Sequence, residues 1–227
     1  MTATIKKRSF RGERGNVLFM ILLAIVVLGA LTMAISQNST EQSDVIPRQT
    51  QDDQINRMLT YASALGSALQ QMVVSGENPL TLYSSLSLLK PGDAGFETSP
   101  NNLKIYHPLG GGITYQSASS PDTNAIATNF NINAGSIITG VGATNTIGDI
   151  VFVATVSSAA YCARINQILY NSAAVPTMNS ATFTSLFTNN TTVTVNGGNC
   201  ASCVNMKQYC VTNGSGAWGF YAALLPG

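Results

Sequence analysis

The sequence predicts an α+β protein in which a long amino-terminal helix, with a membrane-spanning half and an amphipathic half, packs on an antiparallel β-sheet with short helical insertions. Three observations lead to this prediction. An uncharged apolar run covers residues 17–35, and apolar residues then recur at helical spacing over 52–74. The remainder is poor in charge and rich in Asn, Thr, Ser and Gly, a composition that favours turns and short strands.

The apolar run at 17–35 has the length of a membrane span. As a helix it would rise about 28 Å, close to the hydrocarbon thickness of a bilayer. Basic residues dominate before the run and acidic residues after it, so the basic side is expected to stay in the cytoplasm. The sequence therefore predicts a single-pass protein whose carboxy-terminal part is exported.

A further pattern marks the start of this run. A basic leader ends in Gly15, a polar Asn16 follows, and an unbroken apolar segment comes next. This arrangement resembles the amino terminus of type IV pilin-like and pseudopilin proteins. The resemblance implies that a prepilin peptidase cuts between Gly15 and Asn16, often followed by methylation of the new terminus. It also implies a bacterial inner-membrane location, with the folded domain periplasmic or extracellular in a filament.

Two positions depart from the family pattern, which has Phe or Met as the first mature residue and Glu as the fifth. This chain has Asn16 and Met20 there. The family's glutamate is thought to pair with the terminal amine of a neighbouring subunit during assembly. Its absence argues against a major, self-stacking pilin more than against the family.

The resemblance implies a subunit of a type IV pilus or a type II secretion-type filament, with no cofactor. Its partners would be the prepilin peptidase, the inner membrane and other pilin-like subunits, which it would contact through the apolar helix. Two alternatives use the same residues. A secretory signal peptide could be cut near Ala34, and an uncleaved signal anchor would keep Met1. Either would suit an extracellular binding protein of the adhesin kind.

Four segments organise the chain. They are a basic leader at 1–15, a transmembrane or filament-core helix at 16–36, a linker and amphipathic helix at 37–76, and an exported, β-rich domain with disulfides at 77–227. The acidic pair Asp52 and Asp53 complements the positive end of a helix dipole, and Gly76 precedes Pro79 as a stop.

Within 77–227, short helices and strands are expected to alternate. The run 150–156 is the most apolar strand candidate, which predicts a central position in the sheet. Ser157 and Ser158 are candidate caps for the helix that follows. The predicted helices are 80–89, 159–170 and 182–187, and the predicted strands are 103–106, 127–132, 136–139, 150–156, 191–195 and 218–225, with another beginning at 113.

The four cysteines all lie in the last third of the chain: Cys162, Cys200, Cys203 and Cys210. An even number in an exported domain predicts two disulfides, with three possible connectivities. Because Cys162 falls in the predicted helix 159–170, one bond is expected to tie that helix to the terminal segment. Zinc binding and a redox role for the CxxC are the weighed alternatives, and no metal site is expected.

The sequence offers little for catalysis. His107 is the single histidine; it precedes Pro108 beside a run of three glycines, and no nucleophile motif accompanies it. Carboxylates are scattered, so no acid–base pair is expected. From Asn16 onward there are six basic and nine acidic residues without a basic cluster, which argues against a nucleic-acid partner. The chain is therefore expected not to be an enzyme.

Overall fold

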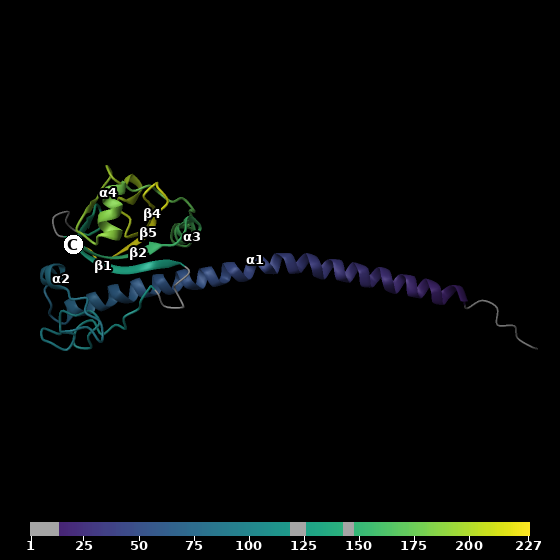
Figure 1. Ribbon diagram of the computed structural model, residues 1–227, viewed down its shortest axis with the longest axis horizontal. Helices are drawn as coiled ribbons and strands as arrows, with labels where there is room; N and C mark the ends of the chain where they lie inside the picture. The colour runs from purple at the N-terminus through teal and green to yellow at the C-terminus, as the bar shows by residue number, and fades with distance from the viewer. Residues whose placement is uncertain (1–13, 119–125, 143–147) are drawn as a thin grey trace, which may run out of the picture. The chain divides into compact units, whose positions relative to one another are not determined.

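The computed structural model describes residues 14–118, 126–142 and 148–227, and within the first helix the side chains of residues 20–28 and 48–74 (Figure 1). This helix, α1, runs from Arg14 to Val74 and has no acidic residue in its first turn. The chain divides into two compact units, residues 1–49 and 50–227, and each is described by itself.

In the first unit, the described side chains of α1 are those of residues 20–28, 48 and 49, and the large hydrophobic ones, which all lie between Met20 and Leu28, are exposed. Across the residues that the structure describes, no helix combines the length and the apolar character needed to cross a bilayer. This corrects two predictions: the membrane-spanning half of the helix, and a single-pass location in a bacterial inner membrane.

In the second unit, the end of α1 buries one face in the main hydrophobic core. The buried residues recur at steps of three and four, the spacing of one helix face. They are Ile55, Met58, Tyr61, Ala62, Leu65, Ala68, Leu69 and Met72. The amphipathic pattern read from 52–74 is confirmed.

The sheet has five strands in the order β3-β1-β2-β5-β4. The strands are β1 (Ala127–Ile138), β2 (Asp149–Val156), β3 (Thr194–Val195), β4 (Gln208–Thr212) and β5 (Trp218–Leu225). Strands β1, β2, β5 and β4 pair antiparallel, but β3 lies parallel to β1. The prediction of an antiparallel sheet is therefore wrong: the sheet is mixed.

Polar side chains explain why β3 joins β1 in parallel. Asn133 Nδ2 donates to the Thr191 carbonyl at 2.9 Å, and the Val193 N–H donates to Ser136 Oγ at 3.1 Å. Both side chains belong to β1, so they draw residues 191–193 alongside it before β3 begins. A periodicity argument does not register such bonds because they join residues more than fifty positions apart.

Both faces of the sheet are covered. On β2, Ile150, Phe152 and Ala154 belong to the core that contains α1, while Val151 and Val153 belong to a second core. Helix α4 (Ser180–Phe183) and the π-helical turn η1 (Thr184–Thr188) supply the second core, and Figure 1 shows α4 on the opposite side of the sheet from the end of α1. Phe187 packs so closely on β5 that a Cβ at Gly219 would lie 2.6 Å from its ring.

Other elements follow the sequence with shifted bounds. Helix α2 (Pro79–Ser85) is shorter than expected, and α3 (Ala159–Tyr170) matches, with Ser158 Oγ accepting from the Tyr161 N–H. Strand β1 is one strand rather than two, because Gly135 at φ +98° takes up a register shift between Ala134 and Ser136. The expected strand at 103–106 forms turns around a single β-bridge between Lys104 and Ser87, and β4 was not predicted.

The edge strand β4 is covered by α3. Asn166 Oδ1 accepts from the Cys210 N–H at 2.9 Å, and its Nδ2 donates to the Cys210 carbonyl at 2.8 Å. The side chain thus makes the two hydrogen bonds that a neighbouring strand would make. A Cys162–Cys210 disulfide adds a covalent link between the same two elements. An edge closed in this way offers no template at Cys210 for pairing with another chain.

We predict that Asn166→Ala lowers the free energy of unfolding by about 2–3 kcal/mol, because it leaves the Cys210 backbone groups buried without partners. Thermal and urea unfolding with the disulfides intact would measure the change. The control is Gln167→Ala, whose side chain bonds only to Asn171 among described partners and which should stay within about 0.5 kcal/mol of the parent. Equal stability of the two variants would contradict the role of Asn166.

Candidate functional site

The predicted processing site, Gly15 and Asn16, falls within the range of α1. The side chains of both residues lie outside those that the structure describes. Cleavage between them therefore stays a prediction.

The structure pairs the cysteines as Cys162–Cys210 and Cys200–Cys203. The first bond joins α3 to β4, and the second closes the short 3₁₀ turn η2 (Ala201–Cys203). All four residues are buried and none is a free thiol. Within the described ranges, no three His, Cys, Asp or Glu residues gather as a metal site would require. The three roles considered for these sulfurs were structural disulfides, zinc binding and a redox CxxC, and the arrangement is that of two structural disulfides.

His107 serves the loop that contains it. Its Nδ1 accepts the Leu109 N–H at 3.1 Å, its Nε2 lies 3.3 Å from a Glu97 oxygen, and its ring packs on Phe96 at 5.1 Å between centroids. An Nδ1 that accepts a hydrogen bond carries no proton, so the proton is on Nε2 and faces Glu97. Both nitrogens are engaged in fixing the loop, and among the described residues no hydroxyl or thiol bonds to either.

Lys104 is the second anchor of this loop. It is 3% exposed, and its ammonium donates to Asn101 Oδ1 and to the carbonyls of Gly95, Phe96 and Thr98. Acceptors that surround a buried cation in this way replace the water it has lost. Residues 95–101 are thus wrapped around one ammonium group, in a segment with little regular secondary structure.

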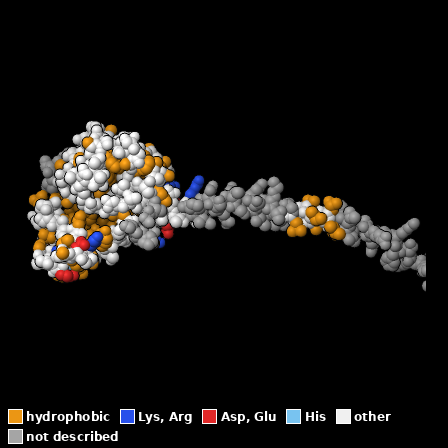
Figure 2. Space-filling model, viewed as in Figure 1, with side chains coloured by type: hydrophobic (Ala, Val, Ile, Leu, Met, Phe, Trp, Pro, Cys, Tyr) orange, Lys and Arg blue, Asp and Glu red, His pale blue; other side chains and the backbone are white. Residues whose placement is uncertain are grey.

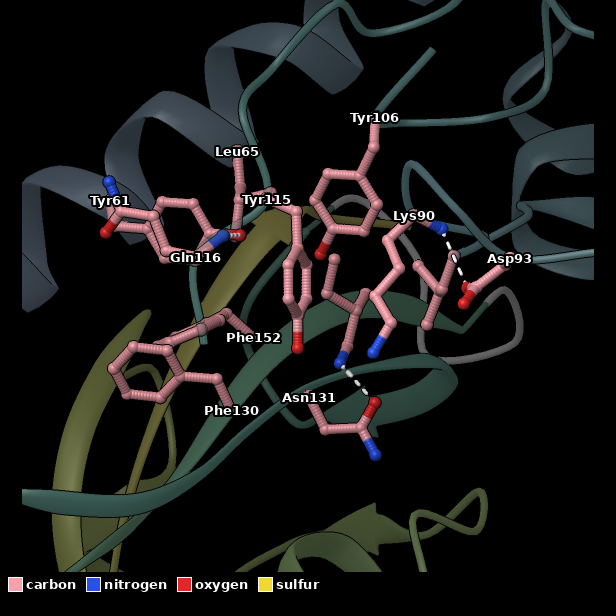
Figure 3. Close-up of a pocket in the computed structure, with 12 residues that line it drawn as sticks. Tyr61, Leu65, Lys90, Asp93, Tyr106, Tyr115, Gln116, Phe130, Asn131 and Phe152 are labelled. Atoms are coloured by element: carbon pink, nitrogen blue, oxygen red, sulfur yellow. Dashed lines mark hydrogen bonds between the residues drawn. The ribbon is translucent and has the colours of Figure 1, made fainter. Parts of the chain in front are cut away.

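A pocket opens between this loop region, the end of α1 and strands β1 and β2 (Figure 3). Its volume is about 180 Å³. Aromatic rings form much of its wall, and polar side chains stand among them. The rings are Tyr61, Tyr106, Tyr115, Phe130 and Phe152, and the polar side chains are Lys90, Asp93, Gln116 and Asn131.

The rings hold one another in fixed orientations. Tyr61 is stacked near Phe130 with centroids 6.1 Å apart, and Tyr106 meets Tyr115 edge to face at 5.2 Å. Lys90 Nζ lies 5.0 Å from the centre of the Tyr115 ring, and Figure 3 shows this pair side by side above Asn131. A cation over a ring face is an attractive arrangement, which fixes the Lys90 chain at the mouth.

Two tyrosine hydroxyls line the pocket as neutral groups. Tyr61 Oη accepts the Gln116 N–H at 3.2 Å. Burial raises the pKa of Tyr61, and burial together with the neighbouring Tyr61 raises the pKa of Tyr106 further. Both phenols therefore stay protonated at physiological pH and can give or take hydrogen bonds without carrying charge.

Sequence reasoning missed this pocket. Its residues come from α1, from the stretch 88–116 and from two strands, so no local motif joins them. The available signal was compositional: Tyr106 and Tyr115 flank the glycine turn at 110–112, and Lys90 begins the turn Lys90-Pro91-Gly92-Asp93 earlier in the same stretch.

Comparison with known proteins adds no assignment. The chain matches no protein-family model, and searches of curated proteins and of solved structures find no similar chain. The function is therefore argued from the residues and their geometry.

A buried carboxylate lies elsewhere, at the start of β2. Asp149 is 1% exposed and accepts the Ile138 N–H at 2.7 Å and the Gly227 N–H at 2.8 Å. Tyr83 assists by donating to the Pro226 carbonyl at 3.0 Å. Burial raises the pKa of Asp149, and the two backbone N–H groups partly oppose that rise. This carboxylate fixes residues 226–227 and contacts no pocket residue that the structure describes.

We predict that Lys104→Met lowers the free energy of unfolding by about 2–3 kcal/mol, because four oxygens lose the cation they surround. Cleavage by a protease within residues 86–116 should also become faster. The control is Lys207→Met at an exposed lysine, which should leave both measurements unchanged. Unaltered proteolysis of Lys104→Met would show that the ammonium does not organise the loop.

We predict a distinct pH dependence from Asp149. Its folded-state pKa is raised, so its contribution to stability is complete below the unfolded pKa of about 4 and is lost as pH rises through the folded pKa. The melting temperature of the parent minus that of Asp149→Asn should therefore fall as pH rises above about 4. Asp53→Asn, at an exposed carboxylate, is the control. A constant difference for Asp149→Asn would contradict the raised pKa.

Proposed function

We propose that the chain is a pilin-like or pseudopilin-like subunit of a type IV pilus or a type II secretion-type filament, processed after Gly15 and assembled through the apolar part of α1. The observation that carries the proposal is the exposure of the side chains from Met20 to Leu28. The large hydrophobic ones are between 49% and 64% exposed. Figure 2 shows them as an apolar cluster on the visible face of the helix.

The distribution of these side chains favours several neighbours over a single one. Eight of the nine residues from 20 to 28 are large and hydrophobic, and they follow one another without a polar position. Since successive helix residues turn by about 100°, such a run is apolar in every direction. A helix of this kind suits the centre of a bundle, where like helices surround it.

The energetic argument is one of burial. Full burial of a large aliphatic side chain is worth about 1.5–3 kcal/mol relative to full exposure. Exposing eight of them to water is therefore costly, and packing against equivalent helices removes that cost. In the proposed assembly, these side chains exchange contact with water for contact with equivalent helices.

The second unit supports a division of roles. Residues 50–227 contain two hydrophobic cores, one on each face of the sheet, and both disulfides. The buried residues of these cores all lie within 50–227, so neither core uses the side chains of Met20 to Leu28.

We predict that the full chain, expressed with a prepilin peptidase, is recovered with Asn16 as its first residue and with a methyl group on that terminus. Amino-terminal sequencing and intact mass would measure this, and a host without the peptidase should yield the uncut chain. Gly15→Val should block cleavage, while the control Gly12→Val in the same leader should not. A product that begins near Ile35, or one that keeps Met1 beside an active peptidase, would refute the proposal.

A further inference from the structure

We propose that the aromatic pocket of the second unit binds a neutral saccharide, with one sugar ring inside the pocket and the rest of the glycan in solvent. This inference goes beyond filament assembly and does not depend on it. It rests on the nature of the wall, the nature of the polar groups and the size of the cavity.

The wall suits the apolar face of a sugar ring. A pyranose presents C–H groups on its faces, and these carry a small positive charge that complements the negative face of an aromatic ring. Tyr115 is half-buried and holds its ring within the pocket, with Lys90 Nζ 5.0 Å from its centre (Figure 3). Tyr61, Phe130 and Phe152 lie in one cluster with centroid distances of 5.3 to 6.1 Å, so the wall opposite the mouth is already packed.

The polar groups suit hydroxyls. Lys90 and the amides of Gln116 and Asn131 can donate, while Asp93 and the same amides can accept. A sugar hydroxyl both donates and accepts, and therefore matches a mixed set of this kind. In the described part of the chain, Lys90 Nζ has the Tyr115 ring as its partner and forms no ion pair, which leaves its donors for a ligand.

The charges disfavour an anionic ligand. A single lysine and a single aspartate line the pocket, so their charges offset one another. A phosphate or sialic acid would gain from Lys90 but would be repelled by Asp93, which is held close by accepting the Lys90 backbone N–H at 2.9 Å. A neutral ligand avoids that repulsion.

The cavity limits the size of what enters. About 180 Å³ is below the roughly 300–1,000 Å³ of pockets that enclose drug-sized ligands or cofactors. It leaves room for one ring, so the remainder of an oligosaccharide would extend through the mouth. A single sugar ring is therefore expected to bind with Kd on the order of 1 mM, weak alone and strengthened by many copies.

The test is saturation-transfer NMR on the full chain in mild detergent, a method suited to weak binding. The probes are the methyl glycosides of glucose, galactose, mannose, N-acetylglucosamine and N-acetylgalactosamine, with sialic acid as the anionic comparison. We expect transfer to at least one neutral glycoside and a loss of affinity of about tenfold in Tyr115→Ala, because the ring face is removed.

Two further variants keep the outcome decisive. Lys90→Met changes an exposed side chain, so it should fold normally and weaken binding several-fold even where Tyr115→Ala proves unstable. Tyr161→Ala, at a half-buried tyrosine of α3 outside the pocket, should leave binding unchanged. Absence of transfer to every neutral glycoside, transfer to sialic acid alone, or transfer unaffected by Tyr115→Ala and Lys90→Met would overturn the proposal.

Discussion

Strand β2 is apolar on both faces, and the second unit is arranged around that constraint. A strand of this kind is stable only between two layers, because either face exposed to water would lose the burial of its Ile, Val and Phe side chains. The end of α1 covers one face, and α4 with the turn Thr184–Thr188 covers the other. The close contact of Phe187 with Gly219 on the neighbouring strand shows how tightly the second layer packs.

Buried polar side chains then supply hydrogen-bond partners for backbone groups that the hydrophobic cores leave without them. Asn166 closes the edge at Cys210, Asp149 holds the backbone of Ile138 and Gly227, and Lys104 gathers four oxygens of its loop. Each is a buried side chain whose hydrogen-bonding groups are matched by backbone partners, as burial of polar atoms requires. The loop around Lys104 depends most on such side-chain hydrogen bonds, since it has little regular secondary structure. By fixing that loop, Lys104 and His107 also fix one side of the aromatic pocket.

The two units present different surfaces. Residues 20–28 expose eight large hydrophobic side chains, whereas residues 50–227 bury most of theirs in two cores and expose mostly uncharged polar groups. The first surface is suited to like helices and the second to solvent, and the aromatic pocket belongs to the second unit. The proposed assembly and the proposed saccharide binding therefore use separate parts of the chain and can be tested independently.

The sequence by itself determined the elements whose signal is local. The 3.6-residue repeat at 52–74, the Ser158 cap of α3 and the apolar run of β2 each depend on residues near one another, and each predicted element is present.

Tertiary structure decided the rest. The parallel β3, the pairing of Cys162 with Cys210 and the conversion of 103–106 from strand to turns all depend on partners brought together by folding, as does the pocket. Local periodicity reports which face of an element is apolar; which other segment meets that face is set by contacts between residues far apart in the chain.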